Sequence, residues 1–233
     1  MNYMFGSLKR FDYFLYGLSV IIILISNTII QTQNLSYTFT VLIGLIALIY
    51  TAKAHVLGQI FMVIFSILYS LIALNFDYYS EFITYGFMTL PMSVVALVSW
   101  MKHPSETHPN QVKTAQLKRI DWLFLVLITF VVTLIFGFVL YLLKTPNLMF
   151  SILSITTSFV AVYLTYRRSQ YYAIAYATND LVLVALWGYA TFVKISYLPL
   201  LICFSLFFIY DLYGFIHWSS LSKLDEANRF EIN

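Results

Sequence analysis

Long apolar stretches separated by short polar connectors follow one another along the chain. The hydrocarbon core of a bilayer, about 30 Å thick, needs roughly 20 apolar residues per helix. The stretches are rich in Leu, Ile and Phe, which favours helices, because an open sheet edge is not tolerated in lipid. We therefore predict an all-α integral membrane protein with eight transmembrane helices, near Phe11–Gln31, Tyr37–Ala52, His55–Phe76, Tyr79–Met101, Ile120–Leu143, Asn147–Tyr166, Gln170–Val193 and Ile195–Trp218.

The composition agrees with a membrane protein and excludes several other classes. Of the 233 residues, 61% are apolar and only 10% are charged. A soluble domain has roughly 45–50% apolar and about 25% charged residues. This excludes a soluble enzyme, a nucleic-acid-binding protein and a disordered tail. The net charge of +3 is too small to indicate a polyanionic partner, and the lone Cys203 excludes a disulfide framework and a thiolate metal cluster.

The basic residues are distributed unevenly between the two sides of the predicted membrane. With eight spans, Lys144 and Lys194 fall on one side, and the remainder of the 13 Lys and Arg residues fall on the other. By the positive-inside rule, both termini are then cytoplasmic, in a multi-pass protein of the cell membrane. The first span is expected to be retained rather than cleaved as a signal peptide, because no small-x-small cleavage site occurs in Gln31–Asn34.

Two parts of the chain resemble each other at a constant offset of 118 residues. Aromatic residues recur at this offset in three pairs: Tyr69 and Trp187, Tyr79 and Tyr197, and Trp100 and Trp218. A basic turn precedes the first helix of each pair. Chance similarity among aromatic-rich helices is the alternative interpretation. The pattern favours an internal duplication.

The duplication divides one membrane domain, residues 1–233, into four parts. Residues 37–101 form the first triple-helix repeat and 147–218 the second, with 120–143 as a linker helix and 11–31 as an extra N-terminal helix. One helix between the triples gives both the same orientation in the membrane. This predicts a parallel 3+1+3 repeat about an axis normal to the bilayer, with a substrate site at the interface between the halves.

An acidic residue, Asp180, lies near the middle of the seventh predicted span. A charge at that depth costs at least about 2.5–3.5 kcal/mol on insertion scales, so the side chain should face a wet cavity or a partner. It belongs to one helical stripe, formed by Tyr172, Tyr176, Asn179, Asp180, Leu183 and Trp187. We expect an aromatic ring of a solute to stack here while Asn179 and Asp180 bind its polar edge. The alternative is a helix–helix contact made by an amide and a protonated acid.

Other polar side chains occur in neighbouring spans. Asp211 either contacts the solute or anchors its helix near Arg167 and Arg168, and Gln59 lies on a polar face of the third span. Glu81 is expected to be solvated near the outer interface. Pro91 predicts a kink, either a hinge or a static bend. The sequence contains no H-E-x-x-H, G-x-S-x-G or P-loop pattern, so we expect neither an enzyme nor a cofactor or metal site.

Several runs resemble the Pnu family of vitamin transporters. They are Gly58-Gln-Ile, Tyr79-Ser-Glu81, Pro91, Trp100 and Asp211-Leu-Tyr-Gly-Phe-Ile-His-Trp218, within roughly Thr40 to Ser220. The resemblance implies a core related to the SWEET sugar transporters, with three helices, a linker and three helices. It also implies facilitated diffusion, with the solute trapped in the cytoplasm by a partner kinase, and a homotrimer as a possible assembly.

One difference from the family concerns the aromatic residues of the seventh span. Nicotinamide riboside transporters carry a W-x-x-W pair at positions where this chain has Ala173 and Tyr176, and the polar residue that follows falls on Asp180. Relatives without the pair carry thiamine, riboflavin or deoxynucleosides. We predict alternating-access transport of a nucleoside-like vitamin of the nicotinamide riboside type, with a sugar carrier or a non-transporting scaffold as alternatives. The predicted substrate-binding residues are Gln59, Tyr172, Tyr176, Asn179, Asp180, Trp187 and Asp211.

Overall fold

The computed structural model describes residues 8–30, 35–75, 78–105, 110–145 and 147–232. Within these ranges, eight helical spans are long and apolar enough to cross a membrane, which confirms the predicted number. They are α2 (Arg10–Ile30), α3 (Leu35–Ala52), α4 (Leu57–Asn75), the continuous span of α5 (Tyr79–Ile83), η1 (Thr84–Thr89) and α6 (Leu90–Met101), then α7 (Arg119–Leu142), α8 (Leu148–Tyr166), α9 (Tyr172–Val193), and η2 (Ile195–Tyr197) with α10 (Leu198–Ile232). The predicted ends Gln31 and Phe76, and the segment Gln31–Asn34, lie outside the described residues.

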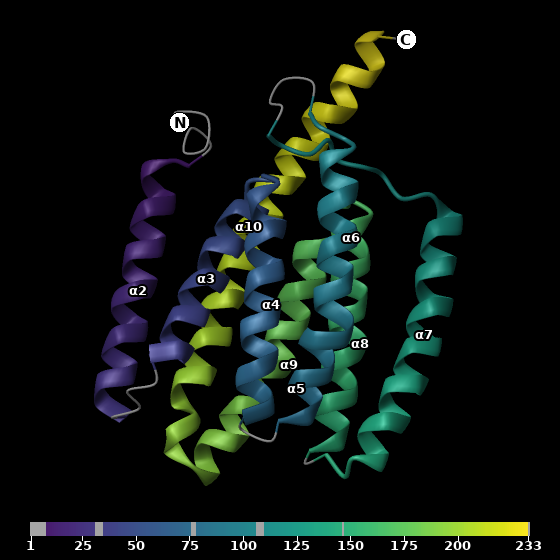
Figure 1. The fold of residues 1–233 in the computed structure, drawn as a ribbon. Coiled ribbons are helices and arrows are strands. Elements are labelled where there is room, and N and C mark those ends of the chain that lie inside the picture. Colours follow the sequence, from purple (N-terminus) through teal and green to yellow (C-terminus); the bar gives the residue numbers. More distant parts are fainter. Residues whose placement is uncertain (1–7, 31–34, 76–77, 106–109, 146, 233) are drawn as a thin grey trace.

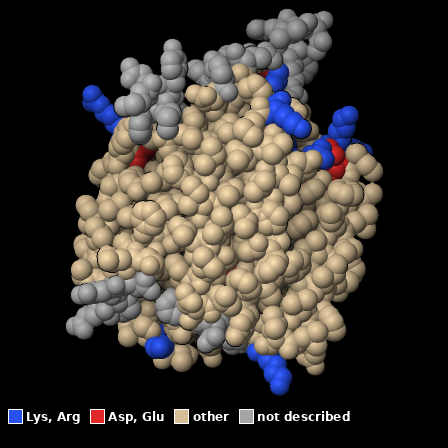
Figure 2. All heavy atoms as spheres, in the orientation of Figure 1, with Lys and Arg blue, Asp and Glu red and all other residues tan. Residues whose placement is uncertain are grey.

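The helices run side by side as one bundle (Figure 1). α2 begins and α10 finishes at the same end of the bundle, which we call the termini end. α2 and α7 flank the bundle on opposite sides, and the other spans lie between them. In the view of Figure 2, blue atoms lie at both ends, red atoms lie towards the termini end, and tan atoms cover the middle. Most large apolar side chains of α7 are exposed, as expected for a helix that faces lipid.

The last helix is longer than the sequence predicted. The predicted span finishes at Trp218, whereas α10 continues to Ile232 beyond the termini end (Figure 1). The Oδ2 atom of Asp225 accepts hydrogen bonds from the backbone N–H of Thr114 at 2.9 Å and from its hydroxyl at 2.7 Å. The extension therefore binds the connector between α6 and α7. Thr114 and Asp225 lie far apart in the sequence, so hydropathy alone predicted an end of the helix that is too early.

Two tryptophans make reciprocal contacts at the termini end. The indole N–H of Trp100 in α6 donates to the backbone carbonyl of Thr165 in α8 at 3.0 Å, and that of Trp218 in α10 donates to the carbonyl of Thr51 in α3 at 2.9 Å. The two indole rings lie 5.5 Å apart. The last helix of each triple thus binds the first helix of the other triple at the termini end. Two like-oriented repeats would make contacts of this kind.

The flanking helices α2 and α7 start in the same way. The sequence runs Leu8-Lys-Arg-Phe-Asp12-Tyr at the start of α2 and Leu117-Lys-Arg-Ile-Asp121-Trp at the start of α7. In each case the aspartate accepts a hydrogen bond from the backbone N–H three residues before it, at 2.6 Å for Asp12 and 2.8 Å for Asp121. A carboxylate in the first turn satisfies a free N–H group there and is stabilised by the helix dipole.

Each aspartate also forms an ion pair with the basic residue that follows the next helix along the chain. Asp12 pairs with Lys53 after α3 at 3.0 Å, and Asp121 pairs with Arg167 after α8 at 2.8 Å. The two pairs differ in burial. Lys53 is 1% exposed and Asp12 is 0% exposed, whereas Arg167 is 32% exposed.

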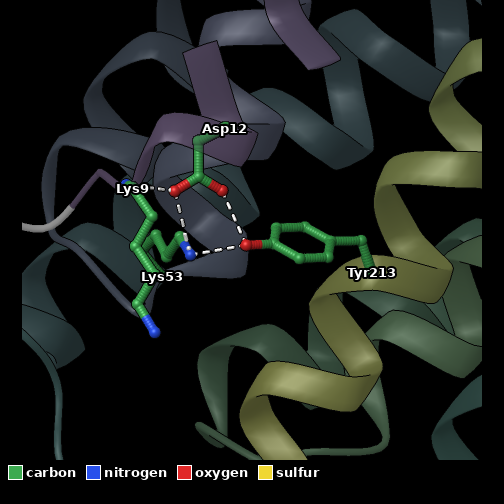
Figure 3. Close-up of polar contacts among 4 residues, drawn as sticks. All are labelled: Lys9, Asp12, Lys53 and Tyr213. Atoms are coloured by element: carbon green, nitrogen blue, oxygen red, sulfur yellow. Dashed lines mark hydrogen bonds and ion pairs between the residues drawn. The ribbon is translucent and has the colours of Figure 1, made fainter. Parts of the chain in front are cut away.

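The buried ion pair has a third member, Tyr213 of α10 (Figure 3). The Lys53 ammonium group donates to the Tyr213 hydroxyl at 2.6 Å, and that hydroxyl donates to Asp12 Oδ1 at 2.6 Å. The network therefore connects α2 with the end of α3 and with α10. It joins the flanking helix to both triples at the termini end.

Candidate functional site

The aromatic residues of the α9 stripe lie in two separate groups. Towards the termini end, the ring of Tyr172 lies 4.8 Å from that of Trp218 and 6.2 Å from that of Tyr176. At the other end, the ring of Trp187 lies 4.7 Å from that of Tyr78. Tyr172 and Trp187 are fifteen residues apart, which is roughly 22 Å along a helix. The two therefore cannot hold the same ring, and each packs at a different end of the interior.

Two buried carboxyl groups meet between these aromatic groups. Asp180 of α9 and Asp211 of α10 are each 3% exposed, and their side chains are within hydrogen-bonding reach of each other. Like charges repel strongly in a low-dielectric interior, so a carboxyl pair at this depth is a costly arrangement that suits a site for a polar solute better than a packing contact. Asp211 therefore lies beside Asp180. It does not anchor its helix near Arg167, which pairs with Asp121.

Tyr172 and Tyr176 approach this carboxyl pair from the termini side. Both phenol rings lie close enough to Asp211 to interact with it electrostatically, and Tyr176 also interacts with Asp180. The structure thus brings together four of the predicted site residues. Aromatic faces beside carboxyl groups suit an aromatic solute with polar substituents.

Asn179 is held by hydroxyl groups of the neighbouring helix α8. Its Oδ1 atom accepts hydrogen bonds from Thr157 and Ser158, both at 2.9 Å, and from Ser154 at 3.4 Å. These three bonds hold the amide oxygen towards α8, and none of them uses the amide nitrogen. Ser154 and Ser158 were not among the predicted site residues. Their spacing of four residues on α8, opposite an amide on α9, is the pattern that could have identified them.

Gln59 forms a hydrogen bond with the end of α3 rather than with the Asn179–Asp180 couple. Its amide nitrogen donates to the hydroxyl of Thr51 at 3.5 Å, near the junction of α3 and α4. The carbonyl of the same Thr51 accepts the indole N–H of Trp218. Gln59 is therefore positioned beside the contact between the triples at the termini end.

Glu81 is buried, and the expectation that it is solvated is wrong. Its side chain is 1% exposed, and neither carboxylate oxygen has a hydrogen-bond partner in the described part of the chain. It interacts electrostatically with Tyr69, Tyr78 and Tyr85, and Tyr85 also interacts with Asp180. Hydropathy places Glu81 near the end of its span. Its position on the same helical face as Tyr85, four residues later, could have indicated that it points inward.

A π-helical segment follows Glu81 in the same span. The backbone N–H of Leu90 donates to the carbonyl of Tyr85, five residues earlier, rather than four as in an α-helix. Pro91 comes next and has no N–H group to donate. The irregularity predicted from Pro91 is therefore a widened turn, η1. Such turns occur frequently at functional sites, and this one carries Tyr85.

Several buried polar atoms of the interior have no partner among the described residues, although buried polar groups are usually paired. They come from both triples and include Glu81 Oε1 and Oε2, Thr84 Oγ1, Ser151 Oγ, Asp180 Oδ2 and Trp187 Nε1. Acceptors and donors of this kind can bind a polar solute. In the described ranges, no group of three or more His, Cys, Asp or Glu side chains could hold a metal ion.

Comparisons with known proteins indicate a membrane transporter. The sequence profile of the nicotinamide mononucleotide transporter family matches residues 34–220. The chain is similar to the nicotinamide riboside transporter PnuC of Neisseria mucosa, with 26% identity over 185 residues, which covers 77% of this chain and 70% of that protein. Its fold resembles the crystal structure of the vitamin B3 transporter PnuC, with a TM-score of 0.83 and 21% identity over 96% of this chain and 97% of that one.

Proposed function

Because the chain belongs to the nicotinamide mononucleotide transporter family and is a multi-pass membrane transporter, we propose that it carries a nucleoside-like vitamin of the nicotinamide riboside type. The observation that carries this proposal is the polar centre between two aromatic groups. Asn179, Asp180 and Asp211 are buried there. A heteroaromatic ring can stack on Tyr172 or Tyr176, while its carboxamide and ribose bind the amide and carboxyl groups.

The transport mechanism that we propose is alternating access with facilitated diffusion. The Tyr172–Trp218 contact closes the interior towards the termini end, and the Tyr78–Trp187 contact closes it at the other end. Opening one contact while the other stays closed would expose the centre to one side at a time. The basic residues at the termini end support a cytoplasmic location for both termini. A cytoplasmic kinase that phosphorylates the solute would then make uptake irreversible.

We propose further that each repeat contains four helices rather than the predicted three. Asp12 of α2 and Asp121 of α7 occupy equivalent places, each paired with the basic residue after the next helix. α2 would then correspond to α7, instead of being an addition outside the repeat. Four helices per unit also give both units the same orientation, so the parallel arrangement is unchanged.

Equilibrium binding to the purified protein tests the proposed site. Stacking of a base on an aromatic ring is worth roughly 1–3 kcal/mol, so Tyr176→Ala should weaken nicotinamide riboside binding by about 5- to 150-fold. Asp180→Asn should weaken it as well. The matched control is Tyr189→Ala on the same helix, because Tyr189 is 57% exposed. Unchanged affinity in both site variants would contradict the assignment.

Transport into liposomes tests the mechanism. Labelled nicotinamide riboside should equilibrate across the membrane without any ion gradient. A strict requirement for a proton or sodium gradient would reject facilitated diffusion. Thermal-shift measurements with nicotinamide riboside, thiamine, riboflavin and deoxynucleosides identify the solute, because a ligand that binds only the native state raises the unfolding temperature.

A further inference from the structure

The buried charges of the described residues do not balance. Among the Asp, Glu, Lys and Arg side chains, the buried ones are Asp12, Lys53, Glu81, Asp180 and Asp211. Lys53 is the only basic residue among them, and it pairs with Asp12 at the termini end. The three remaining acidic side chains all lie in the interior of the bundle, without a basic side chain beside them. Buried acidic groups are normally paired with a cation or kept protonated.

Glu81 differs from the other two acids in its surroundings. Asp180 and Asp211 contact each other, whereas both oxygens of Glu81 lack a hydrogen-bond partner among the described residues. The carboxyl group interacts electrostatically with Tyr69 and Tyr85, whose rings lie 4.5 Å apart in an edge-to-face contact. A carboxylate and the face of an aromatic ring both attract a positively charged ring.

Tyr85 connects Glu81 with the polar centre. Its ring interacts electrostatically with Glu81, which belongs to the first triple, and with Asp180, which belongs to the second. It is carried by the π-helical turn η1. Tyr85 also interacts with Tyr176. A solute whose ring stacks on Tyr176 can therefore contact the Asn179–Asp180 couple with its polar groups, while Tyr85 and Glu81 approach the ring from the first triple.

We propose that Glu81 is the counter-charge for a cationic aromatic ring, and that the transporter selects such solutes over neutral analogues of the same shape. This inference rests on the proposed function. It adds that the solute is positively charged and that Glu81 recognises this charge. The ring of nicotinamide riboside is a pyridinium with a permanent positive charge. Entry of this ring would bring a positive charge to Glu81, whereas a neutral ring would leave Glu81 without a counter-charge.

The test compares nicotinamide riboside with its reduced form, the neutral dihydropyridine that keeps the ribose and the carboxamide. The wild-type protein should bind the oxidised form at least about tenfold more tightly, as expected for a desolvated contact between a cation, a carboxylate and aromatic rings. Glu81→Gln should weaken binding of the oxidised form by about tenfold or more and leave binding of the reduced form nearly unchanged. Glu81→Asp keeps the charge and should retain the preference.

The matched control is Glu226→Gln, the same change at an exposed position of α10. Equal affinity of the wild-type protein for both forms would overturn the inference and leave the proposed function intact, and this measurement requires no variant to fold. Equal weakening of both forms in Glu81→Gln would also overturn it, since that result indicates a structural role. Binding of neither form by the wild-type protein would reject the proposed substrate itself.

Discussion

Replacing Asp12 with alanine is expected to lower the free energy of unfolding by about 3–5 kcal/mol, because the change leaves a buried ammonium group without its counter-ion. Lys53 is 1% exposed, and its partners are Asp12 at 3.0 Å and the Tyr213 hydroxyl at 2.6 Å. The Tyr213 hydroxyl would lose its acceptor as well. Thermal and denaturant unfolding of the protein in detergent measure this effect, which should be among the largest for any single substitution.

Asp121→Ala is the matched control for this prediction. Asp121 has the same place at the start of α7 and pairs with Arg167 at 2.8 Å, but Arg167 is 32% exposed, so water can solvate the charge that remains. Little loss of stability is expected. The double variant Asp12→Asn with Lys53→Met removes both buried charges and should recover much of the lost stability. Equal effects of Asp12→Ala and Asp121→Ala would contradict the importance of burial.

Gly58→Ala should also destabilise the protein, although alanine is normally the better helix former. A Cβ atom at Gly58 would lie 2.5 Å from the backbone nitrogen of Thr51 and 2.8 Å from its Cα atom. Backbone atoms cannot rotate away, so α3 and α4 would have to separate. Overpacking of this kind costs typically 1–3 kcal/mol, and occasionally more. The shift would also move the Thr51 carbonyl, which accepts the indole N–H of Trp218.

Gly17→Ala in α2 is the control for the glycine substitution. A Cβ atom there meets no other atom within 4 Å, so the variant should gain about 1 kcal/mol at most from helix propensity. The comparison needs only the unfolding midpoints of the wild-type protein and the two variants. If the midpoint of Gly58→Ala equals that of Gly17→Ala, the close approach of α3 and α4 does not limit stability.

The shared start of the flanking helices α2 and α7 was not recognised from the sequence. The offset of 118 residues identified aromatic pairs in two triples of helices, and α2 and α7 were left outside. The shared run Lys-Arg-x-Asp at Asp12 and Asp121 was visible in the sequence, but its offset differs from that of the aromatic pairs. Its meaning became clear only from the ion pairs with Lys53 and Arg167, which involve residues far along the chain.

The sequence by itself determined the number of spans, because the cost of placing polar groups in lipid depends on composition over a window of about 20 residues. It also identified Asp180, since a carboxyl group in the middle of an apolar span needs a partner wherever the helix packs. Both conclusions depend on local properties of the chain. They follow without knowledge of which helices are neighbours.

The tertiary structure decided which polar groups meet. The burial of Glu81, the contact of Asp211 with Asp180 and the bonds from α8 to Asn179 each depend on how helices distant in sequence face each other. Tyr172 and Trp187 share a stripe of α9, but they lie at opposite ends of the interior, because a helix spaces them along its axis. Hydropathy and helical periodicity describe one helix at a time, whereas partners for buried polar groups come from the neighbouring helices.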